Sequence, residues 1–188
     1  MHSTIRCFAA TFLLFFAQTL PAAAAADDYE NAVSKWRSYE DVARWLDGNF
    51  AFDTARLQSI LGRTRANGPS GLLARTARGT YEQKSGYCTD AANFALQALN
   101  RIDSTYKAQF VFIRNQYGQP HHWVTGFTVN GRIMVMDYGA GPEWKGMKGV
   151  HGPYDTLEQY GEFLRSLNIK RFAPEAVEWK PNFPGQED

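Results

Sequence analysis

The spacing of apolar residues changes part-way along this chain of 188 residues, and that change restricts the folds it can adopt. Over residues 87–101, apolar side chains recur every three or four positions, which predicts a helix with one buried face. Further on, β-rich runs occupy 110–113, 123–129 and 132–136, and the turn signal Asn130-Gly131 joins the last two into a predicted hairpin. Helices that precede an antiparallel sheet predict an α+β domain.

Three further segments have helical spacing. They are 29–46, 52–65 and 156–167, and Asp53 can act as the N-cap of the second. The segment 139–152 is rich in glycine, which favours irregular backbone over a helix or a strand. We therefore expect a loop there.

Residues 1–26 have the features of a secretory signal. Arg6 supplies a positive start, residues 8–16 form an apolar run, and residues 21–26 offer small side chains for cleavage. The apolar run is shorter than the roughly 20 residues that span a membrane, so we expect no stable membrane insertion. The sequence thus predicts a periplasmic or secreted protein whose residues 27–188 form a single domain.

Charge and motifs exclude several classes of partner. The chain carries 20 Lys and Arg against 19 Asp and Glu, and this near balance argues against nucleic acid, which requires clustered positive charge. The sequence has no phosphate-binding loop, no paired-cysteine motif and no H-E-x-x-H motif. We therefore expect no cofactor, and we do not expect His121, His122 and His151 to hold a metal ion.

Once the export signal is removed together with Cys7, Cys88 is the only cysteine and cannot form an internal disulfide. It stands at the start of the predicted helix 87–101. A helix N-terminus offers unpaired N–H groups and partial positive charge, which favour a thiolate and can hold an oxyanion. A lone cysteine can also be a small buried apolar residue, but this position favours a nucleophile.

A base and an orienting acid are available on the predicted hairpin. His121 and His122 open its first strand, and Asp137 closes the second. A two-residue turn at Asn130-Gly131 places His122 on the same face as Asp137, whereas a three-residue loop with a bulge places His121 there. The residues alone leave both alternatives open.

Three strings in this order resemble the transglutaminase-like superfamily of papain-fold thiol enzymes, and in particular its bacterial cysteine peptidases. They are Gly86-Tyr87-Cys88-Thr89-Asp90, His121-His122-Trp123-Val124 and Val135-Met136-Asp137-Tyr138. The superfamily pattern is G-x-C at a helix start, H-x-W-V on a strand and Asp on the next strand. The resemblance implies a papain-like fold in which the helix that bears the nucleophile packs on an antiparallel sheet.

The resemblance also implies a triad. H-x-W maps onto His121 and Trp123, so we prefer Cys88, His121 and Asp137 over the set with His122. The chain departs from the pattern where Tyr138 follows the Asp, since many relatives have Pro there. The flanking segments match no pattern, which leaves the substrate open.

An oxyanion needs a second donor besides the Cys88 N–H, and we expect it from Gln83 or from the indole of Trp123. Together these residues predict a thiol-dependent amide-bond hydrolase or acyltransferase that acts on a protein or peptide through an acyl-thioester. Two alternatives are a cell-wall peptide amidase and a non-catalytic peptide-binding module on the same fold.

Overall fold

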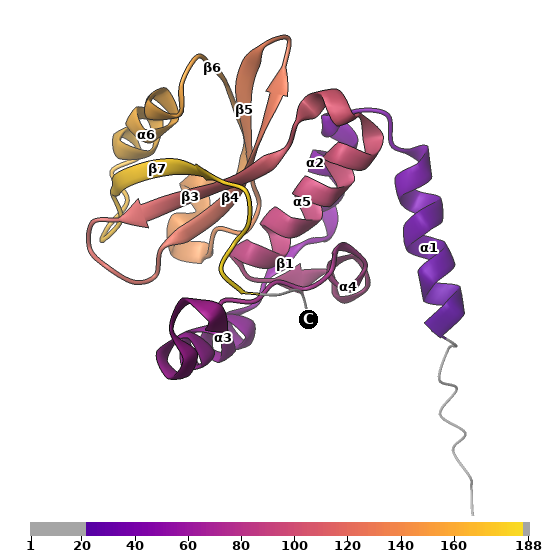
Figure 1. The fold of residues 1–188 in the computed structure, drawn as a ribbon, viewed down its shortest axis with the longest axis horizontal. Coiled ribbons are helices and arrows are strands. Elements are labelled where there is room, and N and C mark those ends of the chain that lie inside the picture. Colours follow the sequence, from indigo (N-terminus) through magenta and orange to yellow (C-terminus); the bar gives the residue numbers. More distant parts are fainter. Residues whose placement is uncertain (1–21, 186–188) are drawn as a thin grey trace, which may run out of the picture.

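The computed structural model describes residues 22–185, and it has the expected α+β architecture. Helices dominate the first half of the chain and strands the second (Figure 1). The α-helices are α1 (Ala22–Lys35), α2 (Tyr39–Asn49), α3 (Thr54–Asn67), α4 (Ala77–Gln83), α5 (Cys88–Ile102) and α6 (Leu157–Ser166). Short 3₁₀ segments are η1 (Gly68–Gly71), η2 (Ser104–Tyr106) and η3 (Pro142–Met147).

The main sheet has five antiparallel strands in the order β6-β5-β4-β3-β7. Its members are β3 (Gln109–Asn115), β4 (His122–Val129), β5 (Arg132–Asp137), β6 (Gly149–Tyr154) and β7 (Pro174–Lys180). Two very short parallel strands, β1 (Ala51–Phe52) and β2 (Ser85–Gly86), form a separate pair just before α5. The chain therefore enters α5 from a short strand that is paired with β1.

The sheet buries both of its faces against helices (Figure 1). On one face, Phe127 and Met136 pack with the apolar side of α5, which includes Phe94. On the other face, Val124 and Val135 pack against α6. The alternation of side chains along β4 and β5 thus separates two cores.

Two predicted segments need correction. The helix expected over 29–46 is two helices, because Ser38 caps α2 and the carboxylate of Asp41 accepts the N–H groups of Arg37 and Ser38 at 2.7 and 3.3 Å. The loop expected over 139–152 contains η3 and the edge strand β6, which pairs with β5. The high glycine content therefore gave no indication of β6, which is stabilised by its pairing with β5.

Most of the predicted export signal, including Cys7, lies outside the described residues, and residues 22–26 form the beginning of α1. In the described range 22–185, no helix combines the length and the apolar character needed to cross a membrane. Asp53 caps α3 as expected, accepting the Arg56 N–H at 2.9 Å.

Candidate active site

Cys88 is the first residue of α5, and its side chain is buried. Tyr87 precedes it in an extended conformation and acts as the N-cap. The first N–H groups of a helix have no partner within the helix, so the amide of Cys88 is available to a ligand. The sulfur therefore stands beside a hydrogen-bond donor at the positive end of a helix dipole.

A buried carboxylate holds the start of α5 in place. Asp90 is fully buried and accepts the backbone N–H groups of Tyr87 and Arg75, both at 2.7 Å. The guanidinium of Arg56 reaches the same carboxylate at 3.0 and 3.2 Å, and that of Arg75 at 3.5 Å. Because Arg56 comes from α3 and Arg75 from the segment before α4, this cluster ties two other parts of the chain to the start of α5.

The hairpin brings a histidine to a carboxylate. Val129 pairs with Arg132 across a two-residue turn, and this register places Val124 opposite Asp137. Side chains two positions apart share a face, so His122 and Asp137 lie on the same side of the sheet. The Nε2 atom of His122 lies 2.7 Å from Oδ2 of Asp137, and the backbone N–H of Gly139 donates to Oδ1 at 3.2 Å.

The electrostatics of this pair favour a charged imidazole. Burial alone would lower the pKa of His122, but the carboxylate of Asp137 and the side chain of Cys88 outweigh it and raise the pKa to about 10. With Nε2 bound to Asp137, Nδ1 is the ring nitrogen left to exchange a proton with Cys88. The arrangement thus favours an imidazolium between the carboxylate of Asp137 and the side chain of Cys88.

Tyr87 adds a hydroxyl to the site. Its burial, followed by the charge of Cys88 and a hydrogen bond to it, raises the pKa of the phenol well above its ordinary value. The hydroxyl oxygen also lies 3.5 Å from the carbonyl oxygen of His121. Tyr87 consequently stays a neutral donor beside the sulfur at any physiological pH.

Close packing fixes the relative positions of the sulfur and the imidazole. Gly139 follows β5 and lies so near α5 that a Cβ atom there would come within 2.4 Å of the Cα of Cys88. The indole of Trp144 packs edge-on against the ring of His122, with 5.6 Å between centroids. Trp144 in turn contacts Phe172, so His122 has little freedom to rotate.

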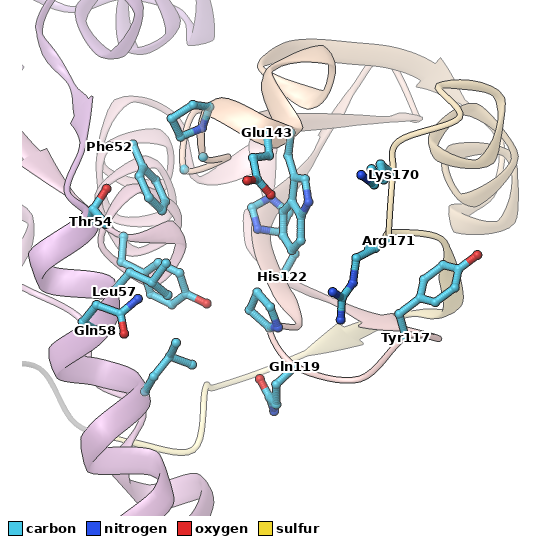
Figure 2. A pocket seen from close by; sticks show the side chains of 17 residues that line it. Phe52, Thr54, Leu57, Gln58, Tyr117, Gln119, His122, Glu143, Lys170 and Arg171 are labelled. Carbon is cyan, nitrogen blue, oxygen red and sulfur yellow. The ribbon is translucent and has the colours of Figure 1, made fainter.

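A cleft of about 560 Å³ opens at this site. Figure 2 shows His122 in its middle, between a wall that carries Phe52, Thr54 and Leu57 and a side that carries Lys170, Arg171 and Tyr117. The first wall comes from β1 and α3, and the second from the loops next to β3 and β7. The imidazole can therefore reach a bound molecule.

A scan against protein-family models gives one further observation. Residues 23–143 match a family model described as a transglutaminase-like domain. The chain belongs to the transglutaminase-like family. The match covers well over half of the chain and includes Cys88, His122 and Asp137. Transglutaminase-like domains often occur in enzymes, and no curated protein matches this chain by sequence.

Within this transglutaminase-like domain, the preference for His121 needs correction. The Nδ1 atom of His121 accepts the backbone N–H of Asn115 at 3.2 Å, and its ring packs edge-on against Phe112. It lines a second cleft, of about 680 Å³, beside the first. Burial, followed by the charge of Arg114, lowers the pKa of His121, which leaves it neutral and turned away from Asp137.

Neither expected oxyanion donor occupies the anticipated place. Gln83 is exposed at the end of α4 and does not line the cleft around His122. Trp123 is buried beside Cys88, but it alternates with His122 along β4 and therefore lines the second cleft, where it packs on Phe110 and Phe112. The hydroxyl of Tyr87, which the sequence analysis did not consider as a donor, interacts with Cys88, and Tyr87 lines the cleft.

Other parts of the site also went unnoticed in the sequence. The Asp90 cluster joins residues 15 and 34 positions apart, which no local pattern indicates. The imidazole of His151, considered above as a metal ligand, lies 2.6 Å from the carbonyl oxygen of Met147. Among residues 22–185, no group of three His, Cys, Asp or Glu side chains is arranged to hold a metal ion.

Proposed function

We propose that this transglutaminase-like domain is an exported cysteine peptidase that hydrolyses an amide bond through an acyl-thioester on Cys88. The proposal rests on one observation above all: His122, which lines the cleft, interacts with both Asp137 and Cys88. A structural histidine does not need a carboxylate on one nitrogen and a thiol from the first turn of a helix on the other. That order of groups is the arrangement of a thiol nucleophile, its base and its orienter.

In the first half-reaction, the Cys88 thiolate attacks the substrate carbonyl and a C–S bond forms. The amide N–H of Cys88 and the hydroxyl of Tyr87 are positioned to donate to the developing oxyanion. As the tetrahedral intermediate collapses, the C–N bond breaks and the His122 imidazolium gives its Nδ1 proton to the leaving amine. Asp137 keeps the ring oriented and stabilises its charged form throughout.

In the second half-reaction, neutral His122 takes a proton from a water molecule, which attacks the thioester carbonyl. The C–S bond breaks, the new carboxylic acid leaves, and the thiolate–imidazolium pair is restored. A lysine side chain could replace water and give transamidation. The exposed cations Lys170 and Arg171 beside His122 would repel an ammonium group, which favours water as the acceptor.

The experiment is a cleavage assay with residues 27–188 and a library of quenched fluorescent decapeptides, followed by mass spectrometry of the products. We expect hydrolysis by the unaltered protein and a loss of at least about 10³-fold in Cys88→Ala, since removal of a nucleophile has costs of this order. Thermal unfolding should show that Cys88→Ala remains folded. Peptide binding without cleavage, or cleavage that persists in Cys88→Ala, would contradict the proposal, and the first outcome would identify a binding module.

A further inference from the structure

The two sides of the cleft around His122 differ in chemistry. One side is mostly apolar and comes from Phe52, Leu57 and Leu61. The opposite side carries Lys170 and Arg171, and Figure 2 shows the guanidinium of Arg171 extending toward His122. A peptide that crosses the cleft therefore meets an apolar surface on one side of the reacting atoms and two cations on the other.

Within the described residues, the side chains of the two cations have no ion-pair partner. In the part of the chain from 22 to 185, neither Lys170 nor Arg171 forms an ion pair, whereas other exposed arginines do, namely Arg78, Arg101, Arg132 and Arg165. Glu143 also lines the cleft, but no ion pair joins it to either cation. Both side chains are exposed, so their charges are available to a ligand.

The backbone beneath these cations is anchored although their side chains are free. The carbonyl oxygen of Arg171 accepts a hydrogen bond from the Asn115 side-chain amide at 3.2 Å, at the end of β3. The next residue, Phe172, is buried and packs on Trp144, which in turn packs on His122. This continuous chain of contacts fixes the position of Arg171 relative to the imidazole.

We propose that Lys170 and Arg171 form a carboxylate-binding subsite that selects peptides with an acidic group on one side of the scissile amide. The inference deepens the proposed function, on which it rests for the position of the scissile bond. Arg171 can hold a carboxylate with two parallel hydrogen bonds, and Lys170 adds a second positive charge. Both residues lie outside the matched segment 23–143, so the subsite belongs to the flank of this chain.

The carboxylate can come from an Asp or Glu side chain or from the C-terminus of a short peptide. Both sources offer the same planar anion, so the experiment has an arm for each. One arm compares peptides with Asp or Glu against peptides with Asn or Gln at each position around the cleaved bond. The other compares a free C-terminal carboxylate with a C-terminal amide in otherwise identical peptides.

The variants are the double replacement Lys170→Gln with Arg171→Gln, the reversal Arg171→Glu, and Lys145→Gln as a control. Lys145 is an exposed cation on η3 that does not line the cleft, so its replacement removes one positive charge without altering the subsite. We expect the double variant to lower kcat/KM about tenfold or more for peptides that carry the recognised carboxylate. For the matched peptides, in which Asn, Gln or a C-terminal amide replaces that carboxylate, we expect the same kcat/KM as with the unaltered protein. Arg171→Glu should improve cleavage of peptides that carry Lys at the same position.

Two readouts separate this inference from the proposed function. Cleavage is measured with the unaltered Cys88, and peptide binding is measured with Cys88→Ala, in which chemistry is absent. Equal cleavage of the acidic peptides and their uncharged counterparts by the unaltered protein would overturn the subsite but not the proposed peptidase activity. An equal loss of cleavage of both kinds of peptide in the double variant would have the same meaning. If the Cys88→Ala protein binds acidic peptides selectively, if the double replacement abolishes this selectivity, and if the unaltered protein cleaves no peptide, the subsite would be supported and the proposed peptidase activity overturned.

Discussion

His122 and Asp137 are joined by a 2.7 Å contact between Nε2 and Oδ2, and both side chains are almost completely buried. A buried carboxylate stabilises a positive charge on the ring, and the opposite ring nitrogen is left for Cys88. The pair therefore places a positively charged imidazole beside the sulfur of Cys88.

The raised pKa of His122 predicts the pH dependence of activity and stability. The folded value of about 10 exceeds the ordinary value of 6.5, so the contribution of the charged ring to stability is complete below about pH 6.5 and is lost as the pH rises through 10. We expect kcat/KM to keep its plateau across neutral pH and to fall only toward pH 10. Measurements of kcat/KM and of thermal unfolding between pH 6 and pH 10.5 check both statements.

Replacement of the acid tests the origin of that shift. Asp137→Asn removes the carboxylate and should lower activity by about 10³-fold or more, because the ring loses both its orientation and its charge stabilisation. The alkaline limb of any remaining activity should move to lower pH. An Asp137→Asn profile with the same alkaline limb as the unaltered protein would show that Asp137 does not set the pKa of His122.

Tyr87→Phe tests the proposed oxyanion donor. The ring packs near Phe52 and should keep its place, while the hydroxyl beside Cys88 is lost. We expect kcat to fall by about 10²-fold with little change in KM, because the donor acts on charge that develops only during the reaction. Tyr138→Phe, which removes a hydroxyl from a half-buried tyrosine outside the cleft, serves as the control. An unchanged kcat in Tyr87→Phe would remove Tyr87 from the mechanism.

Asp90→Ala tests the cluster that holds the start of α5. It leaves Arg56 and Arg75 beside an empty buried site, and we expect a loss of about 3 kcal/mol in the free energy of unfolding. Asp41→Ala is the matched control, since Asp41 also accepts the N–H of an N-cap and pairs with an arginine, but at the surface. There we expect about 1 kcal/mol. Urea unfolding measures both, and equal losses would contradict the account.

Gly139→Ala tests the close approach between β5 and α5. The added Cβ would lie 2.4 Å from the Cα of Cys88, so the nucleophile must shift, and we expect a loss of about 2 kcal/mol of stability together with reduced activity. Gly48→Ala in α2 meets no atom within 4 Å and should be neutral or slightly stabilising. Thermal unfolding and the peptide assay compare the two. A Gly139→Ala protein with unaltered activity would refute the contact.

Local sequence patterns predicted the elements that carry the chemistry. Helical spacing identified α5, the Asn130-Gly131 signal identified the hairpin, and Asp53 was confirmed as the cap of α3. The identity of the histidine could not be decided in this way, because it depends on whether the turn has two residues or three. The resemblance then favoured His121, although the observed register places His122 beside Asp137.

Features that depend on distant pairing left no local signal. Strand β7 begins with a proline and contains charged residues, and it is stabilised mainly by its partner β3. The Asp90 cluster likewise assembles from separate segments, and the fold brings residues 170 and 171 to the cleft that His122 lines. Packing in three dimensions, which one sequence does not display, determines such sites.

The most direct test of the triad is the rate at which iodoacetamide alkylates Cys88 at pH 6. Residues 27–188 contain no other cysteine, so the signal belongs to one sulfur. We predict that the unaltered protein reacts far faster than free cysteine, that His122→Ala reacts at about the rate of free cysteine, and that His121→Ala keeps the fast rate. A slow reaction in the unaltered protein, or a loss of the fast rate in His121→Ala but not in His122→Ala, would contradict the account.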